Sequence, residues 1–180
     1  MPGFYTLEWR DGRTEDLFGH RGYYYVLPDR RLVSFLPDPA WCRHCGAITL
    51  CEHLRQVAEI EQELTTLDDP NSERSLQLGR SPNPGFPETW RQVLLLQLRH
   101  AQLRELPPSC LTCGQRDVAY FPEGEWAPHP GTGEEVRFSF AGMCSTDFAR
   151  KFYDVDGKLL DLSESEREAL KQSIRQDKGL

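Results

Sequence analysis

The residues of this chain best suited to chemistry are its six cysteines, which fall into two groups. Each group opens with two cysteines separated by two residues and followed by glycine, at Cys42 and Cys45 and again at Cys110 and Cys113. A tight turn at this spacing directs both thiolates to one ion, and the glycine lets backbone amides face the sulfurs. A structural zinc site needs three or four Cys and His ligands at one point. The sequence therefore predicts two zinc ions per chain.

The first predicted site takes its remaining ligands from the residues just downstream. Cys51 and His53 follow the first pair and stand at the start of an expected helix, whose N-terminal partial charge stabilises a thiolate. Together with Cys42 and Cys45 they make a four-ligand set. His44 is not expected to be a ligand, because it lies inside the turn and its side chain points away from the ion when both flanking cysteines bind.

The second predicted site has an open choice of fourth ligand. Cys110, Cys113 and Cys144 supply three thiolates, and either His129 or Asp147 supplies the fourth. His129 offers the softer nitrogen, whereas Asp147 has the better position, three residues after Cys144 at the start of a helix. A three-ligand site would leave a position for a catalytic water, but no neighbouring acid or base is evident.

Two local resemblances accompany these sites, and neither covers the whole chain. The run Cys51-Glu52-His53-Leu54 before an apolar-periodic helix, with a close cysteine pair upstream, resembles SWIM-type zinc fingers over residues 41–66. Those fingers open with Cys-x-Cys, whereas this segment opens with Cys-x-x-Cys. The resemblance implies the first ligand set given above, contact with DNA or protein beside larger assemblies, and no catalysis. Residues 110–153 resemble a treble clef, with a knuckle, a hairpin and then a helix that carries ligands.

The elements around these sites indicate an α+β fold of small antiparallel hairpins and a few helices, organised around the two zinc sites. Hairpins are expected within residues 4–18 and 23–36, helices over 52–67, 88–106 and 163–176, and paired strands at 118–121 and 135–140. The Pro- and Gly-rich stretch 68–87 is expected to be a linker or mobile loop. The expected domains are residues 1–67 and residues 88–180. Small modules of this kind need a metal because they bury little apolar area.

Composition limits the classes of partner. The 180 residues carry a formal net charge of -7, which disfavours a broad nucleic-acid surface, although a local basic face remains possible. The N-terminus lacks a signal-peptide pattern and the longest aliphatic run, residues 93–96, is far too short to span a bilayer. We therefore expect a cytoplasmic protein with no membrane partner. In a reducing compartment close cysteines favour metal binding over disulfides.

These observations favour a non-catalytic, zinc-binding adaptor or regulatory subunit that acts through another protein. The alternative is a nucleic-acid-binding accessory protein, which the zinc-finger resemblance supports and the acidity opposes. An enzyme is the least favoured class. A zinc hydrolase lacks a nucleophile and base, and a thioredoxin-like oxidoreductase would begin its helix at Cys42, where this chain has a turn closed by Gly46. The sequence leaves the oligomeric state open.

Overall fold

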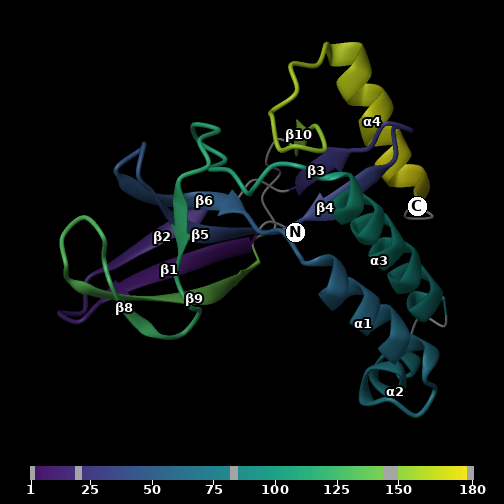
Figure 1. Ribbon diagram of the computed structural model, residues 1–180, viewed down its shortest axis with the longest axis horizontal. Helices are drawn as coiled ribbons and strands as arrows, with labels where there is room; N and C mark the ends of the chain where they lie inside the picture. Colours follow the sequence, from purple (N-terminus) through teal and green to yellow (C-terminus); the bar gives the residue numbers. More distant parts are fainter. Residues whose placement is uncertain (1–2, 19–21, 82–84, 144–149, 178–180) are drawn as a thin grey trace. The chain divides into compact units, whose positions relative to one another are not determined.

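The computed structural model describes residues 3–18, 22–81, 85–143 and 150–177, and within them it has a mixed α+β fold (Figure 1). This confirms the predicted fold class. The strands are β1 (Gly3–Trp9), β2 (Thr14–Phe18), β3 (Gly22–Val26), β4 (Leu32–Phe35), β5 (Pro37–Cys42), β6 (Ala47–Glu52), β7 (Val118–Tyr120), β8 (Trp126–Pro128), β9 (Glu135–Met143) and β10 (Arg150–Tyr153). The helices are α1 (Val57–Asp68), α2 (Glu73–Gly79), α3 (Phe86–Leu103) and α4 (Glu164–Asp177).

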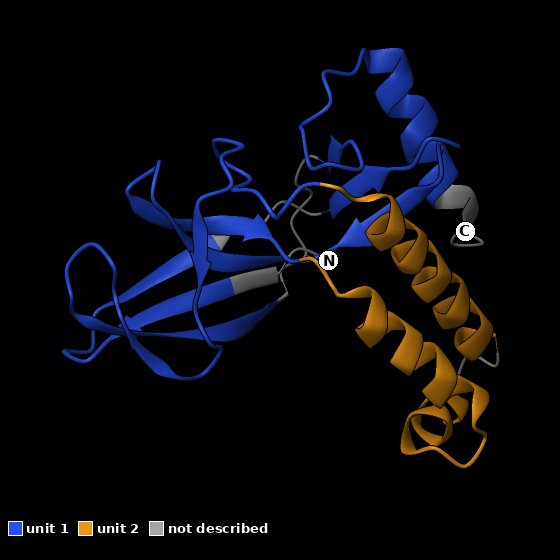
Figure 2. Ribbon diagram, in the orientation of Figure 1, with its two compact units in different colours: residues 1–53, 106–180 blue, residues 54–105 orange. Residues whose placement is uncertain are grey.

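The chain divides into two compact units, shown in Figure 2. The first unit combines residues 1–53 with residues 106–180, and the second is residues 54–105. These boundaries differ from the expected division at residues 67 and 88. The reason is that α1, α2 and α3 pack on one another as an insertion between the two cysteine groups, instead of each joining the group next to it in sequence.

One sheet of the first unit has the strand order β2-β1-β9-β8. The predicted hairpin of β1 and β2 is present and turns at Gly12, whose positive φ of 85° suits a residue without a side chain. Strand β9 pairs antiparallel with β1 and with β8, and buries Val136 and Phe138 against Leu7. The predicted hairpin of residues 118–121 with 135–140 was wrong, because β7 pairs with β5 instead.

A second sheet has the order β10-β3-β4, with α4 packed against it. The predicted β3–β4 hairpin is confirmed, and β10 joins β3 in parallel. Leu170 and Ile174 of α4 are buried with Leu32 and Phe152. The predicted start of this helix is also confirmed, since Ser163 Oγ accepts a hydrogen bond from the Glu166 amide and the Glu166 carboxylate accepts one from the Ser163 amide.

The third sheet, β6-β5-β7, carries the first cysteine pair in the turn between β5 and β6. Cys42 ends β5, and Cys51 lies on β6, opposite Asp38. The helix expected over residues 52–67 therefore begins five residues late, at Val57, because the chain stays extended through Glu52 to complete the strand pair.

The second unit is an antiparallel pair of helices, α1 and α3, with the short α2 between them. Helix α2 lies within the stretch 68–87 that was expected to be a linker; Ser72 caps it by accepting a hydrogen bond from the Ser75 amide. Within this unit Glu63 accepts hydrogen bonds from the Trp90 indole at 3.0 Å and from Arg55 at 2.7 Å. None of the described helices combines the length and apolar character that crossing a membrane requires.

Candidate metal centre

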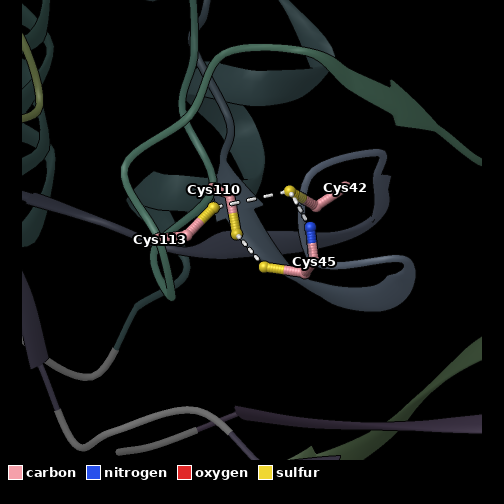
Figure 3. A group of neighbouring side chains, drawn as sticks. All are labelled: Cys42, Cys45, Cys110 and Cys113. Carbon is pink, nitrogen blue, oxygen red and sulfur yellow. Dashed lines mark hydrogen bonds between the residues drawn. The ribbon is translucent and has the colours of Figure 1, made fainter.

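Four cysteines converge in the first unit: Cys42, Cys45, Cys110 and Cys113 (Figure 3). Their four Sγ atoms all lie within 4.8 Å of one another. The Sγ atoms of Cys42 and Cys113 are 3.6 Å apart, and those of Cys45 and Cys110 are 3.9 Å apart. Each close contact joins one cysteine of the first pair to one of the second.

These separations suit four ligands around one ion. A disulfide would bring two sulfurs to about 2.05 Å, far closer than the Sγ atoms lie here. Four sulfurs placed tetrahedrally at about 2.3 Å from a zinc ion are about 3.8 Å apart. The observed Sγ–Sγ distances of 3.6 and 3.9 Å fall on either side of that value. The cluster is therefore shaped to hold a metal ion with four thiolates.

The first pair is held by a tight turn. The Gly46 amide donates to the Cys42 carbonyl at 2.9 Å, and the Cys45 amide donates to Cys42 Sγ at 3.4 Å. Gly46 has a φ of 61°, which residues with a Cβ seldom adopt. The glycine thus closes the turn that places the two thiols side by side.

The second pair repeats this turn. The Gly114 amide donates to the Cys110 carbonyl at 2.8 Å, and the Thr112 amide donates to Cys110 Sγ at 3.4 Å. Gly114 has a φ of 75°. Both predicted Cys-x-x-Cys-Gly turns are therefore present, and each directs an amide at a sulfur, which stabilises the thiolate form.

Backbone pairing brings the two turns together. The amide of Leu111 donates to the Leu50 carbonyl at 3.0 Å, and the amide of Glu52 donates to the Ser109 carbonyl at 2.9 Å. On the other side of the cluster, β7 pairs with β5 through Val118 and Cys42. The second turn therefore lies between two segments that pair with the β5–β6 hairpin: residues 109–111, which pair with β6, and β7, which pairs with β5. This pairing brings the four thiols together.

The thiols differ in their readiness to ionise. Burial raises the pKa of Cys42, and in Cys45 contact with the Cys113 thiol, followed by burial, raises the pKa. Burial also acts to raise the pKa of Cys110, but hydrogen bonds from Thr49 Oγ1, 3.2 Å away, and from backbone amides outweigh it and lower the pKa to about 6. The Cys110 thiolate is thus favoured in advance, and a cation is needed to stabilise Cys42 and Cys45 as thiolates.

A buried carboxylate supports the cluster from behind. Glu52 is fully buried; its Oε2 accepts hydrogen bonds from the Ser109 amide and hydroxyl, each at 2.7 Å. Its Oε1 accepts from the Tyr25 hydroxyl at 2.8 Å. Because Ser109 directly precedes Cys110, these bonds fix the entry to the second turn relative to β3 and β6.

The structure groups the predicted ligands differently from the sequence analysis. Cys42 and Cys45 meet Cys110 and Cys113, and the group does not include Cys51 or His53. Cys51 is buried with its Sγ 3.6 Å from Thr49 Oγ1. His53 is half exposed, with its Nδ1 2.5 Å from an Asp38 carboxylate oxygen. The local reason is that Cys110 and Cys113 lie beside the first pair; Cys51 faces Cys110 from β6 but is outside the group, and His53 follows the end of β6.

The second ligand set is also divided. His129 lies in the loop between β8 and β9, where its Nδ1 accepts hydrogen bonds from the Gly131 and Thr132 amides at 3.2 and 3.1 Å. Its ring packs edge-on against Trp41, and it is not part of the cysteine cluster. Cys144 and Asp147 lie outside the described residues. The described residues therefore show one four-cysteine group, which joins the two cysteine pairs, and no specific SWIM or treble-clef motif.

The feature that the sequence analysis missed is the pairing of the two turns with each other. A signal for it was available, since the two Cys-x-x-Cys-Gly runs are equivalent half-sites and each lacks the same two ligands. Because Cys51 and His53 lie nearer in sequence to the first pair, they were assigned as its remaining ligands, and the equivalence of the two cysteine pairs was overlooked.

No protein-family model, curated protein or solved structure matches the chain.

Proposed function

We propose that the four-cysteine cluster binds one Zn²⁺ as a structural site, in a protein that acts as a non-catalytic interaction adaptor or regulatory subunit. The observation that carries the proposal is the set of four thiols, all within 4.8 Å of one another, presented by two amide-supported turns. Thiolates at this spacing favour zinc among the common divalent ions. Both cysteine pairs are taken up in one cluster, so we propose one zinc per chain in place of two.

The role of the ion is to join two distant parts of the chain. The two pairs stand on either side of the helical unit in sequence, and the hydrogen bond from Glu52 to Ser109 closes the chain at the base of that insertion. The cysteine cluster itself buries few apolar groups beyond Ala40 and the cysteines. Zinc binding therefore supplies folding free energy that this small core does not.

A closed four-thiolate site supports the non-catalytic proposal. Catalytic zinc keeps one position open for water or substrate, whereas four protein ligands complete the coordination. In the first unit, two arginines are engaged by carboxylates: Arg10, just after β1, by Glu135 at 2.8 Å, and Arg137, on β9, by Glu8 at 2.5 Å. Paired arginines favour a protein partner over the nucleic-acid alternative.

The helical unit is the part of the chain that we propose contacts the partner. Its exposed large apolar side chains are Leu76 on α2 and Phe86, Leu95 and Leu103 on α3. Exposed large apolar side chains on a helical unit are a surface that a partner's apolar side chains can cover.

Metal analysis tests the zinc proposal. We expect the protein purified without added metal to contain one zinc per chain, and Cys113→Ser to lose it. Cys51→Ala is the matched control, because it removes a buried cysteine outside the four-thiol group, and it should keep the zinc. Zinc lost equally from both variants, or absent from the parent protein, would contradict the proposal.

A further inference from the structure

Cys51 is a fifth thiol beside the cluster with no part in the four-cysteine group. It is fully buried on β6, and an isolated antiparallel bridge pairs it directly with Cys110. The hydroxyl of Thr49 contacts both sulfurs, at 3.6 Å from Cys51 Sγ and 3.2 Å from Cys110 Sγ. The two thiols therefore share one face of the strand pair.

The backbone hydrogen bonds define the type of pair. They run from the Glu52 amide to the Ser109 carbonyl and from the Leu111 amide to the Leu50 carbonyl, so they flank Cys51 and Cys110 without joining them. Directly opposite residues in such a non-hydrogen-bonded pair have Cα atoms about 4.5 Å apart. A disulfide requires Cα atoms about 4.4 to 6.8 Å apart, so this pair meets the requirement without movement of the backbone.

We propose that Cys51 and Cys110 are a cross-strand disulfide site, in which Cys51 withdraws Cys110 from the metal cluster when a hydroperoxide oxidises the thiols. The pairing of the strands fixes the partner, because Cys51 and Cys110 lie directly opposite each other. Cys51, which is outside the four-cysteine group, thereby acquires a role as the disulfide partner of Cys110.

The chemistry balances with a hydroperoxide as the oxidant. The sulfur of Cys110 attacks the peroxide oxygen, the O–O bond breaks, and Cys110 becomes a sulfenic acid while the peroxide leaves as an alcohol or water. The sulfur of Cys51 then attacks Cys110 Sγ, the S–S bond forms, and the S–O bond breaks to release water with the thiol proton. Two thiols are oxidised and one peroxide is reduced.

Loss of Cys110 would leave the ion with Cys42, Cys45 and Cys113. Three thiolates bind zinc more weakly than four, so the disulfide favours release of the ion. This consequence rests on the zinc site proposed above, whereas the disulfide itself depends only on the strand pairing.

Disulfide mapping tests the proposal. The full-length, zinc-loaded protein is treated with hydrogen peroxide, remaining thiols are alkylated, and the chain is digested with a protease that cleaves after leucine. Cleavage at Leu50 and Leu111 separates Cys51 from Cys45 and Cys110 from Cys113. We expect a peptide that links Cys51 to Cys110, with zinc released in step and both changes reversed by a thiol reductant and added zinc. Cys110 linked to another cysteine, with Cys51 still alkylated, would overturn the proposal.

The variant Cys51→Val removes the thiol and keeps the buried site filled. We expect it to hold the same zinc as the parent and to release it several-fold more slowly under peroxide; release at the parent rate would overturn the coupling. Cys51→Ala serves if valine prevents folding. Should the parent bind no zinc, the zinc proposal fails, and the same mapping on the metal-free protein still decides whether Cys51 pairs with Cys110.

Discussion

Cys42 Sγ and Cys113 Sγ lie 3.6 Å apart although 71 positions separate the two residues in the chain. The contact joins the turn between β5 and β6 to the turn that precedes β7, and the whole helical unit lies between them in sequence. A single ion at this contact would therefore close a long loop, and the stability of the first unit would depend on metal binding.

Chelation should destabilise the first unit. Free zinc at a thousandfold excess over Kd adds about 4 kcal/mol to the free energy of unfolding of a protein that binds it only when folded. We expect a chelator to lower the unfolding midpoint of the parent protein and to leave that of Cys42→Ser nearly unchanged, as measured by calorimetry. An equal effect of the chelator on both proteins would show that the cluster is not the metal site.

Replacement of Gly157 tests the packing behind the cluster. A Cβ at this position would overlap the carboxylate of Glu52, and φ is 80°. Gly124 has nearly the same φ, 76°, with nothing within 4 Å of an added Cβ, so it is a matched control for backbone strain. We expect Gly157→Ala to lower the free energy of unfolding by about 2 kcal/mol more than Gly124→Ala does, since overpacking a core costs about that much. Equal losses in urea unfolding would mean that Glu52 is free to move aside.

Replacement of the buried carboxyl group of Glu52 should also be costly. Its side-chain oxygens accept hydrogen bonds from the Ser109 amide and hydroxyl and from the Tyr25 hydroxyl, and a glutamine amide would turn an NH₂ donor toward at least one of these donors. We expect Glu52→Gln to destabilise the protein by about 3 kcal/mol and Ser109→Ala, which removes only the hydroxyl bond, by about 1 kcal/mol. Chemical denaturation of both variants with zinc held in excess measures this difference. An unchanged free energy of unfolding in Glu52→Gln would show that the carboxyl group is dispensable.

The sequence predicted the elements whose signals are local. The turn at Gly12, the cap at Ser163 and the glycine-closed turns at Gly46 and Gly114 each depend on residues within a few positions of one another, and all are present. These signals depend on backbone conformation and short-range hydrogen bonds, which a few adjacent residues determine.

The features that it missed depend on long-range pairing. The spacing of cysteines in the sequence does not show which cysteine pairs meet in the fold. Cys51 was therefore assigned as a ligand, although it lies on a strand that faces Cys110. The strand at residues 135–140 pairs with the N-terminal strand because its buried Val136 and Phe138 complete a core with Leu7, a match that periodicity alone cannot identify.

The helical unit should be sensitive to acid through Glu63. Burial acts to raise the pKa of this carboxyl, but hydrogen bonds from Trp90 and Arg55 outweigh it and hold the pKa below its ordinary value. The stabilisation is therefore complete above the ordinary glutamate pKa of about 4.3 and is lost as the pH falls through the lower value of the folded state.

Fluorine NMR of the protein labelled with 5-fluorotryptophan follows this titration at Trp90. We expect the Trp90 resonance to shift below about pH 4.3 in the parent protein. In Glu63→Gln the shift should be absent, and in Glu61→Gln, which alters an exposed glutamate on the same helix, it should persist. A shift that survives in Glu63→Gln would assign the titration to another group.

The central claim is that one zinc ion is bound by the two cysteine pairs together, and X-ray absorption at the zinc edge of the purified protein tests it most directly. The account predicts one zinc per chain with four sulfur ligands at about 2.3 Å and no nitrogen ligand. A first shell of three sulfurs and one nitrogen at about 2.0 Å would instead indicate a site that includes a histidine, as in the predicted Cys42, Cys45, Cys51 and His53 set, and would contradict the four-cysteine assignment.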